Sequence, residues 1–371
     1  MLKIKSSVLK ETLNQLAVVF KPTTVVPQDS YCMFESLPDN TLKVRFANTD
    51  SEIITFVKDV EITQPFKCLV HYNKLRATTA VMTNDITFKF SDKTVTVSGD
   101  KKISKISIPD MQKMSYYEEY KMQGGVSFTM SGEEFTTGLN AVKDSVKKNK
   151  NVYTYLQGVL FDMSTGKLIL SAVTSKLCAM YETAVKASWN KDVIVPIDII
   201  QSISRWKDVE NVQISVNDSK IIFDTKTLRL STVLLDGKFP NYLKLFEEKN
   251  EQTATINKDD LLSALKFATS VGAVDRTPVI DVLLVEEDGV LKLKTNSIYN
   301  DTTETEIEAD NCVGLKGVFT GQDIQELVSG CEGSVYFNYT PNKTDGRFFI
   351  NSDDPNYHAV IVGLQFKNVQ C

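Results

Sequence analysis

Three stretches of the chain carry the same spacing of apolar residues. In the middle stretch, Phe135, Leu139, Val142 and Val146 follow one another at intervals of four, three and four residues. This spacing puts apolar side chains on one face of an α-helix. The pattern recurs 126 residues earlier at Leu9, Leu13, Leu16 and Phe20, and 126 residues later at Leu261, Leu265, Ala268 and Gly272. The chain therefore predicts three related helices at a period near one third of its length.

Predicted strands keep the same period. A half-buried antiparallel strand is expected at 42–46, where apolar and charged residues alternate after a turn at Asp39-Asn40. Related strands are expected after Thr165-Gly166 and Asp288-Gly289, and the second of these pairs is typical of a hairpin turn. Helix and strand signals thus repeat together.

Each unit also contains a second helical stretch and further strands. The first unit opens with a predicted strand at Leu2–Lys5, and Ser6 or Ser7 is expected to cap the helix that follows. The second helices are expected at 71–82, 196–207 and 320–331. Alternating apolar residues then predict strands at 86–90, 95–97, 212–216, 221–223, 335–339 and 348–350.

These elements predict an α+β protein made of three tandem copies of one unit, each with two helices against antiparallel sheets. Polar stretches at 123–125 and 247–252 are expected to separate the units. The predicted domains are 1–122, 126–247 and 253–371. The alternative is a chance coincidence among leucine-rich helices, but helix, turn and second helix recur in the same order.

Composition limits the possible functions. The chain has 371 residues, of which 42 are basic and 47 acidic, and a net charge of −5. Such a chain does not by itself indicate nucleic-acid binding, so that role would depend on where the basic residues lie. No run of about 18 apolar residues predicts a membrane span, and the charged N-terminal segment is not typical of a secretory signal. Six scattered cysteines without a CxxC pair predict reduced, mostly buried thiols and a cytoplasmic location.

The sequence offers no catalytic motif that we can defend. It has two histidines, His71 and His358, and it lacks HExxH, paired CxxC and Gly-rich phosphate-loop motifs. His71 is expected at a helix start as a surface or capping residue, and His358 beside an apolar β-rich segment. Gly314–Gly317 is expected to be a loop. The acidic clusters at 118–119 and 286–288 are expected to be solvated loops, so no cofactor and no metal site are predicted.

Basic residues gather near the predicted helices of the first two units. Lys143 and Lys147 are four residues apart and are expected to share a helix face. The helix dipole favours cations near a helix C-terminus in any case, so this cluster also has a purely structural interpretation. A basic surface of this kind suits loose phosphate contact without base reading. The candidate DNA-facing residues are Lys74, Arg76, Lys143, Lys147, Lys148, Lys150, Arg205 and Lys207.

Three segments of the chain resemble one protein family. They are Leu235–Tyr242 (LDGKFPNY), Tyr155–Phe161 (YLQGVLF) and Tyr357–Phe366 (YHAVIVGLQF). They are similar to the bacterial DNA polymerase III beta subunit, the replicative sliding clamp, whose DGRFPDY signature is close to the first segment. The resemblance extends over essentially the full chain. It implies three domains of the DNA-clamp fold in a crescent, and two crescents joined head to tail into a ring around duplex DNA.

The resemblance also implies a non-catalytic role. The ring would tether the replicative DNA polymerase and so confer processivity. The polymerase, the clamp loader and other partners would insert a short hydrophobic peptide between the second and third domains, into a site whose mixture of apolar and polar groups suits a peptide anchor. The implied pocket residues are Leu156, Thr174, Lys176, Leu177, Pro240, Lys244, Leu245, Val360, Val362, Gly363 and Leu364.

The chain departs from the family pattern at two places. Val173–Cys178 is two residues shorter than the family's ATDGHRLA and lacks its glycine and histidine. The family's ending, MPMRL, corresponds to Val362–Phe366 here, followed by five more residues. Gly363 in place of proline is expected to loosen this edge of the pocket. Partner affinity or peptide preference is therefore expected to differ from that of the family.

The resemblance also implies a joint between two copies. The edge strand expected at 101–108 would pair with the third unit of another copy, which would satisfy an otherwise unpaired strand edge. Ile103, Lys105 and Val271 are the candidate interface residues. The alternative is that Ile103 is buried within its own domain.

Two other functions stay open from the sequence. A DNA-acting hydrolase would need a metal or nucleophile cluster, which the sequence does not offer. A clamp-fold scaffold would bind partners without encircling DNA and would be a monomer. Sliding requires weak contacts, which scattered lysines supply better than bidentate arginine contacts to bases. We therefore interpret the sequence as a non-catalytic, homodimeric DNA clamp.

Overall fold

The computed structural model describes residues 1–20, 26–114, 116–146, 152–186, 189, 191–248, 250–274, 281–296 and 302–365. All paired strands in it are antiparallel, and helices pack against the sheets, so the predicted α+β class is confirmed. The chain forms two compact units. Unit 1 comprises Met1–Gly132 and Lys207–Leu234, and unit 2 comprises Glu133–Trp206 and Leu235–Cys371.

Unit 1 contains two sheets. Sheet A has the strand order β5-β1-β7-β8-β9, and sheet B has the order β10-β15-β16-β17-β4-β3-β2-β6. In sheet A the strands are β1 (Leu2–Lys5), β5 (Val60–Ile62), β7 (Asp85–Phe90), β8 (Thr94–Gly99) and β9 (Lys102–Ser107). In sheet B they are β2 (Tyr31–Ser36), β3 (Leu42–Ala47), β4 (Ser51–Val57), β6 (Lys67–His71), β10 (Val126–Ser131), β15 (Asn211–Val216), β16 (Lys220–Asp224) and β17 (Leu228–Val233).

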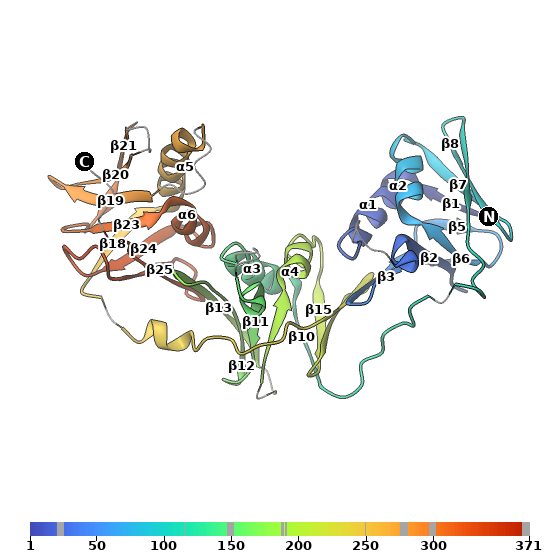
Figure 1. Ribbon diagram of the computed structural model, residues 1–371, viewed down its shortest axis with the longest axis horizontal. Coiled ribbons are helices and arrows are strands. Elements are labelled where there is room, and N and C mark those ends of the chain that lie inside the picture. Colours follow the sequence, from blue (N-terminus) through green and yellow to red (C-terminus); the bar gives the residue numbers. More distant parts are fainter. Residues whose placement is uncertain are drawn as a thin grey trace. The chain divides into compact units, whose positions relative to one another are not determined.

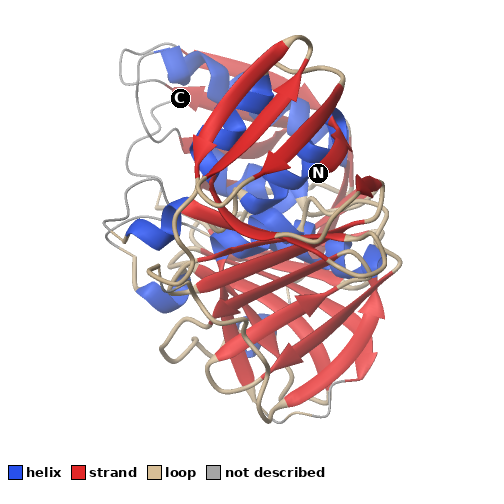
Figure 2. Ribbon diagram, turned by 90° about the vertical axis from the view of Figure 1, so that its right-hand side faces the viewer, coloured by secondary structure: helices blue, strands red, loops and turns tan. Residues whose placement is uncertain are grey.

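Two helices cover the sheets of unit 1. Helix α1 (Ser6–Leu16) contacts β1, β3 and β4, and helix α2 (Tyr72–Ala80) contacts β6 and β9. Figure 2 shows helices behind the strands at this end of the chain. The fully buried Tyr72 ring donates its hydroxyl to the Leu13 carbonyl at 2.8 Å and so joins the two helices. A short 3₁₀ turn, η1 (Pro27–Ser30), precedes β2.

Unit 2 also contains two sheets (Figure 1). Sheet C has the order β14-β11-β12-β13-β26-β25-β24-β18-β22, and sheet D has the order β21-β20-β19-β23. Sheet C contains β11 (Gly158–Asp162), β12 (Lys167–Val173), β13 (Leu177–Lys186), β14 (Asp192–Pro196), β18 (Gln252–Asn257), β22 (Ala309–Asp310), β24 (Ser334–Tyr339), β25 (Arg347–Ser352) and β26 (Tyr357–Val362). Sheet D contains β19 (Asp281–Glu287), β20 (Val290–Asn296), β21 (Thr302–Ile307) and β23 (Lys316–Thr320).

The helices of unit 2 come in two pairs. They are α3 (Gly132–Lys143) with α4 (Ile197–Ile203), and α5 (Lys258–Val274) with α6 (Gly321–Ser329). The 3₁₀ turns η2 (Thr154–Leu156) and η3 (Leu243–Phe246) lie before β11 and after β17. No helix in the described part of the chain is long and apolar enough to cross a membrane.

The threefold repeat predicted from the sequence is confirmed by the strand order. One set of strands recurs as β1-β7-β8-β9, β10-β15-β16-β17 and β18-β24-β25-β26. A second set recurs as β4-β3-β2-β6, β13-β12-β11-β14 and β21-β20-β19-β23. Consecutive repeats share a sheet because β17 pairs with β4, and β26 pairs with β13. The two compact units therefore divide the middle repeat, while the three domain ranges stay a prediction.

The predicted apolar helix faces are buried in the described residues, and α5 spans its whole predicted face, but α1 and α3 end sooner than expected. Leu9, Leu13 and Leu16 are at most 1% exposed, yet α1 ends at Leu16, before Phe20. Helix α3 ends at Lys143, before the buried Val146. Backbone bonds of the i to i+3 kind close the last turn there, with the Val146 N–H donating to the Lys143 carbonyl at 3.2 Å. Lys147 lies outside the described residues, so the helix face expected for Lys143 and Lys147 stays a prediction.

The predicted N-cap of α1 is also wrong. Lys5 holds the cap position, and its side chain makes no capping bond. The Ser6 hydroxyl instead donates to the Met82 carbonyl at 2.6 Å, next to the end of α2. The hydroxyl thus makes a tertiary contact and does not satisfy an N–H of its own helix.

A buried ion pair lies in the middle of sheet B. Arg45 on β3 and Glu52 on β4 are 3% and 5% exposed and are joined through Nε and a carboxylate oxygen. Glu52 also accepts the Tyr120 N–H at 3.1 Å, and the Arg45 guanidinium donates to the Tyr117 carbonyl. The pair therefore holds the segment that follows β9 against the sheet. A buried charge left without its partner is strongly destabilising.

We predict that Arg45→Met destabilises unit 1 by about 3–5 kcal/mol, because Glu52 would then be buried without its counter-charge. Amide hydrogen exchange read by mass spectrometry should show faster exchange in β3 and β4. Lys67→Met is the matched control, since it removes a more exposed ion pair with Glu35 on the same sheet and should change stability by less than about 1 kcal/mol. Equal effects of the two substitutions would contradict the prediction.

Candidate functional site

The candidate site begins at the joint between the second and third repeats. Strand β13 pairs with β26, so that Leu177 lies opposite Ile361 and Tyr181 opposite Tyr357. The hairpin between β12 and β13 ends beside the last residue of β26. The joint therefore brings together segments that lie about half the chain apart in the sequence.

The turn of this hairpin is held by its own side chains. The Thr174 hydroxyl oxygen accepts the N–H groups of Lys176 and Leu177, each at 3.2 Å. The Lys176 carbonyl accepts the Val362 N–H at 2.8 Å, and the Lys176 ammonium donates to the Thr320 hydroxyl at 3.3 Å. The shortened loop is thus an ordered turn, and Lys176 connects it to β26 and β23.

An apolar cluster lies beside the joint, which we call the docking cluster. Its buried members come from β11, β12, β13, β14, β25, β26 and the segment after β17. They are Leu160, Ile169, Val173, Cys178, Met180, Ile194, Phe239, Tyr242, Phe349 and Val360. Its half-buried members are Tyr155, Leu235, Leu245 and Phe246.

The segment 235–242 fixes one wall of the docking cluster. Phe239 and Tyr242 insert into the cluster, and the buried Tyr242 hydroxyl donates to Asp162 Oδ2 at 2.8 Å. Burial, together with this carboxylate, raises the pKa of Tyr242, which stays a neutral donor. Gly237 adopts a φ of +135°, and a Cβ there would lie 2.7 Å from the Cβ of Tyr155. A glycine is therefore required where the segment passes under Tyr155.

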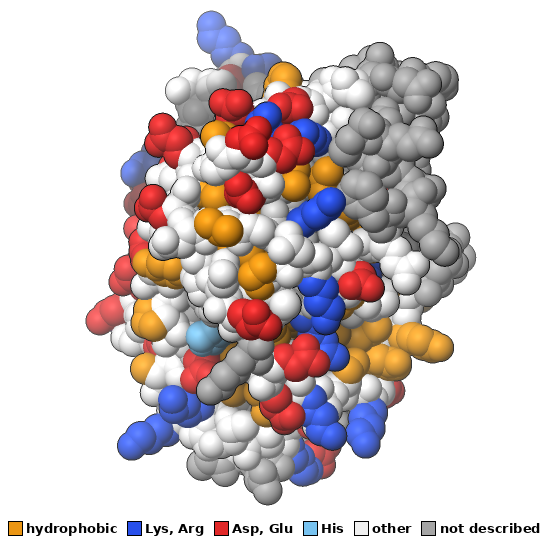
Figure 3. All heavy atoms as spheres, turned by 90° about the vertical axis from the view of Figure 1, so that its left-hand side faces the viewer, with side chains coloured by type: hydrophobic (Ala, Val, Ile, Leu, Met, Phe, Trp, Pro, Cys, Tyr) orange, Lys and Arg blue, Asp and Glu red, His pale blue; other side chains and the backbone are white. Residues whose placement is uncertain are grey.

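Several large apolar side chains near the docking cluster are exposed. Tyr153 is 71% exposed and stacks on Tyr155 with ring centres 5.3 Å apart. Leu243 and Val362 are 39% and 40% exposed. Figure 3 shows one face of the molecule, on which hydrophobic side chains lie between acidic and basic ones. An apolar surface with a polar border is typical of a binding site for a protein segment.

The structure distributes the predicted pocket residues over two apolar clusters. Leu245 and Val360 belong to the docking cluster, whereas Leu364 packs on Leu283, Val285 and Val318 of sheet D. The other predicted residues lie close to the joint or on the segment after β17. Among them Leu177 and Gly363 are buried, Leu156 and Thr174 are half-buried, and Lys176, Pro240, Lys244 and Val362 are exposed. Their role in peptide binding stays a prediction.

The expectation that Gly363 loosens this edge is wrong. Its N–H donates to the Gly346 carbonyl at 2.9 Å, a bond that proline could not make. A Cβ at Gly363 would lie 2.1 Å from the Thr344 carbonyl oxygen and 2.9 Å from the Phe348 ring. Gly363 thus allows the chain to pack closely against the loop before β25.

The sequence did not single out several residues of the site. Met180, Phe349 and Phe246 each carry an ordinary strand or loop pattern, and only the pairing of distant strands brings them together. Tyr153 and Tyr155 are separated by two positions before β11, a spacing that can place two rings on one side of an extended segment. That spacing is the one signal that could have indicated the exposed stack.

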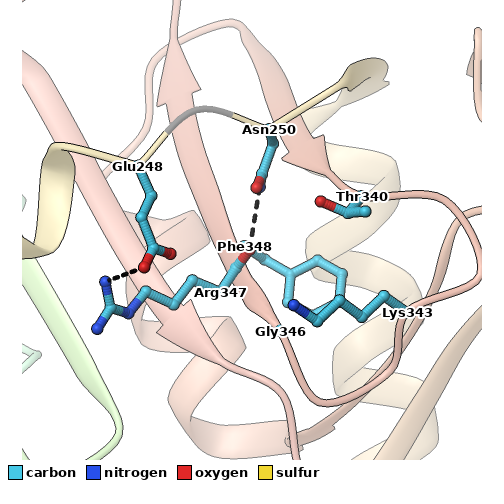
Figure 4. Close-up of a pocket in the computed structure, with 7 residues that line it drawn as sticks. All are labelled: Glu248, Asn250, Thr340, Lys343, Gly346, Arg347 and Phe348. Carbon is cyan, nitrogen blue, oxygen red and sulfur yellow. Dashed lines mark hydrogen bonds and ion pairs between the residues drawn. The ribbon is translucent and has the colours of Figure 1, made fainter.

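A polar cavity of about 260 Å³ lies where the segment after η3 crosses sheet C (Figure 4). Glu248 forms an ion pair with Arg347 at 2.9 Å, and the Asn250 amide donates to the Asn338 and Arg347 carbonyls at 2.7 and 3.0 Å. Thr340, Lys343, Gly346 and Phe348 complete its lining. These contacts fasten the predicted linker to β24 and β25, and the predicted pocket residues do not line this cavity.

The predicted DNA-facing residues have different surroundings. Lys74, Arg76, Arg205 and Lys207 are exposed. Lys143 is half-buried and forms an ion pair with Asp144 at 2.8 Å. Lys147, Lys148 and Lys150 lie outside the described residues.

The predicted interface residues lie on β9 and α5. Ile103 is 72% exposed on β9, an edge of sheet A, so the alternative that it is buried within its own domain is wrong. Lys105 on the same strand is also exposed. The side chain of Val271 lies outside the described residues.

The histidines and cysteines are the remaining residues that were considered for chemistry. His71 holds the N-cap position of α2, at the helix start where it was expected, but its side chain makes no capping bond. Burial and the nearby Lys74 lower its pKa. His358 Nδ1 lies 2.8 Å from Asn351 Oδ1.

Five cysteines are free and buried, and burial raises the pKa of Cys178 to about 12, which makes the thiol unreactive. In the described ranges, no group of three His, Cys, Asp or Glu side chains could hold a metal ion.

Sequence comparison identifies related proteins. Residues 129–241 match the family described as DNA polymerase III beta subunit, central domain. The beta sliding clamp of Chlamydia muridarum is 26% identical over 149 residues, which are 39% of this chain and 40% of that protein. The beta sliding clamp of Treponema pallidum is 23% identical over 240 residues, which are 59% of this chain and 64% of that protein. The chain thus spans less than two thirds of the curated relatives that it matches.

Structural comparison covers nearly the whole chain. The beta subunit from the DNA polymerase of Streptococcus pyogenes aligns with a TM-score of 0.85 at 15% identity, over 98% of this chain and 99% of that one. A sliding clamp from Bartonella birtlesii aligns with a TM-score of 0.86 at 17% identity, over 98% of this chain and 99% of that one. At such identities the likeness establishes the fold. Residues 129–241 thus match the central domain of the DNA polymerase III beta subunits, and the chain as a whole has the fold of the sliding clamps with which it aligns.

Proposed function

We propose that the protein is a sliding clamp of DNA replication, a non-catalytic homodimeric ring that encircles duplex DNA. It tethers the replicative DNA polymerase through peptides that bind at the docking cluster. The observation that carries this proposal is the pairing of the repeats. Two of three equivalent strand pairs form within the chain, and we propose that the third forms between two copies.

In the described part of the chain, one strand of each kind lies at a sheet edge, with a neighbour on one side only. Strands β9, β17 and β26 are equivalent, and so are β4, β13 and β21. Within the chain β17 pairs with β4, and β26 pairs with β13. Strands β9 and β21 lie at sheet edges. Because an edge with free N–H and C=O groups favours pairing with another chain, β9 of one copy is expected to pair with β21 of another, and the reverse pair closes the ring.

The internal joints also predict the register of the pair between copies. Leu230 lies opposite Ile53 at the first joint, and Ala359 lies opposite Ala179 at the second. The equivalent residues of the free strands are Ser104 and Thr303. If Ser104 lies opposite Thr303 in an antiparallel pair, the next residues along the strands, Ile103 and Glu304, also lie opposite each other.

The two strand edges carry opposite charges. Strand β9 carries the exposed Lys102 and Lys105, and β21 carries the exposed Glu304 and Glu306. Opposite charges across an interface favour the correct partner and speed association. In its own chain Glu304 also pairs with Lys292 at 3.0 Å, so it is already held on the strand.

The DNA contacts proposed for the ring are weak and numerous. Lys74 and Arg76 project into solvent from α2, and Arg205 and Lys207 follow α4. Lysine contacts to phosphates carry no sequence information and are weakened by salt, which suits a ring that moves along the duplex. These residues, with Lys143, Lys147, Lys148 and Lys150, are proposed to face the DNA.

The docking cluster is the proposed site for partner peptides. Leucine or aromatic side chains of a short peptide would cover the exposed Leu243 and Val362, and Lys176 and Lys244 would border them. The replicative polymerase and the clamp loader are the proposed partners. Free, buried cysteines agree with a reducing compartment, and the proposed location is the cytoplasm.

We predict a solution mass of about twice the 41.6 kDa chain, measured by light scattering across a concentration series. Ile103→Glu should produce monomers, because the new carboxylate would face Glu304, and like charges directly opposite each other destabilise a strand pair. Ile103→Lys is the matched control and should retain the dimer, because it faces the same carboxylate with the opposite charge. A chain that is monomeric at every concentration would exclude a preformed ring and favour the scaffold interpretation.

We predict that the dimer is retained on nicked circular DNA and lost when that DNA is linearised. Dimers would be dissociated by dilution, mixed with plasmid, concentrated and separated by gel filtration. The variant Lys74→Glu with Arg76→Glu should be retained less at low salt, since it repels phosphates, and the difference should shrink as salt is raised because salt screens the repulsion. Lys67→Glu with Lys89→Glu, two exposed lysines on strands, is the control. Equal retention on linear and circular DNA would refute encirclement.

We predict that Val362→Asp abolishes binding of a labelled six-residue peptide rich in Leu and Phe, followed by fluorescence polarisation. The new charge would lie where the peptide must exclude water. Val290→Asp is the matched control, because Val290 is 37% exposed in the same unit but lies at the start of β20. Binding that survives Val362→Asp, or that is lost in both variants, would argue against this docking surface.

A further inference from the structure

The polar cavity in Figure 4 is lined by two basic side chains and one acidic side chain. Glu248 forms an ion pair with Arg347 at 2.9 Å, whereas Lys343 forms no ion pair with any described residue. A guanidinium group has five N–H donors, so a single carboxylate does not use all of them. The lining therefore carries one net positive charge and has donors available for a ligand.

The cavity continues the face of sheet C on which the docking cluster lies. Along the neighbouring strands β25 and β26, Phe349 lies opposite Val360, and Arg347 lies opposite Val362. Because alternate residues of a strand share a face, Arg347 and Val362 lie on the same side of the sheet as the two buried cluster members Phe349 and Val360. A peptide that covers the exposed Val362 therefore comes next to Arg347.

The segment after η3 forms one wall of both sites. Phe246, at the end of η3, packs on Phe349 of the docking cluster with ring centres 6.3 Å apart. Two residues later Glu248 reaches Arg347, and the Asn250 amide donates to two strand carbonyls at 2.7 and 3.0 Å. The wall that carries Arg347 and its counter-charge is thus fixed beside the cluster before any ligand binds.

The loop before β25 forms the opposite wall. Figure 4 shows the Lys343 side chain extending from this loop toward the side of the cavity where Arg347 lies. A Cβ at Gly346 would lie 3.3 Å from Lys343 Cδ, so the lysine stem lies along the loop backbone. The Gly346 carbonyl accepts the Gly363 N–H at 2.9 Å, which ties the loop to the residue after Val362. Lys343 is therefore held near the docking cluster through its own loop.

We propose that this cavity binds the side-chain carboxylate of an aspartate or glutamate in the partner peptide, next to the apolar residues that cover the docking cluster. The proposal rests on the proposed function and adds a charge requirement to a site otherwise recognised by apolar side chains. The carboxylate accepts hydrogen bonds from the Lys343 ammonium and from the Arg347 donors that Glu248 leaves unused. A basic residue at the same place of the peptide would be repelled by Lys343. Because exposed ion pairs contribute little affinity, the cavity mainly selects among peptides with similar apolar residues.

The test is fluorescence polarisation with the full chain and labelled, C-terminally amidated peptides that share one apolar core rich in Leu and Phe. The residue that flanks this core, at one end or the other, is Glu, Gln or Lys. One of the Glu peptides should bind about fivefold more tightly than its Gln analogue, and the Lys analogue should bind more weakly. These differences should shrink as salt is raised, because salt screens exposed charges.

Substitutions in the cavity show where the carboxylate binds. Lys343→Gln should abolish the difference between the Glu and Gln peptides without changing the affinity for the Gln peptide, and Lys343→Arg should restore the difference. Glu248→Gln should enlarge it, because Arg347 then has no acidic partner in the cavity. Lys186→Gln is the matched control and should have no effect, since Lys186 is an exposed lysine at the end of β13 away from the hairpin turn.

The second basic candidate is Lys244, which borders the docking cluster. A preference for Glu that survives Lys343→Gln but is lost in Lys244→Gln would overturn the proposal, because the carboxylate would then bind at that border. Equal affinities for the Glu and Gln peptides would also overturn it and would leave the docking cluster intact as a peptide site. Failure of every peptide to bind would overturn the docking site itself, and this proposal with it.

Discussion

The backbone hydrogen bonds of strand edges are the constraint on which the rest of this structure depends. A repeat of two four-stranded sheets has free N–H and C=O groups along its sides, and leaving them unpaired favours association. In this chain the edge strand of one repeat pairs with the edge strand of the next, at β17–β4 and at β26–β13. Neither compact unit therefore coincides with a repeat, and each is built around one such joint.

The same joint positions the docking cluster. Its walls come from both repeats, since Met180 lies on β13 and Val360 on β26. The turn at Thr174–Leu177 is fixed by hydrogen bonds to its own threonine and to Val362. A binding surface built on a strand joint is rigid because its residues are held by sheet hydrogen bonds, and rigidity lowers the entropy lost on binding.

The sequence predicted the repeated elements because their signals are local. The period-3.6 face of α1 and the Asp288-Gly289 turn depend on neighbouring residues alone, and both residues of that turn have the positive φ angles the pair favours. The predictions that failed concern residues whose position depends on tertiary contacts. The Ser6 hydroxyl bonds to Met82, far away in the chain, and not to its own helix.

The docking cluster could be predicted only in part for the same reason. Leu245 and Val360 were found through resemblance to a family, whereas Phe246 and Phe349 pack together across about one hundred residues of sequence. The local sequence pattern around each phenylalanine is the same as that around an ordinary core residue. The effect of Gly363 was predicted wrongly. It depends on a contact with the loop at Thr344, and no local sequence pattern reveals that contact.

The position of Gly237 under Tyr155 has a consequence for inhibitor design. The signature segment that contains this glycine inserts Phe239 and Tyr242 into the cluster and passes under the exposed aromatic stack, so both of its aromatic rings are buried. A compound that binds the outer surface would not reach them. Selective compounds would instead have to be fitted to Tyr153, Leu243 and Val362, the side chains that this chain presents to solvent.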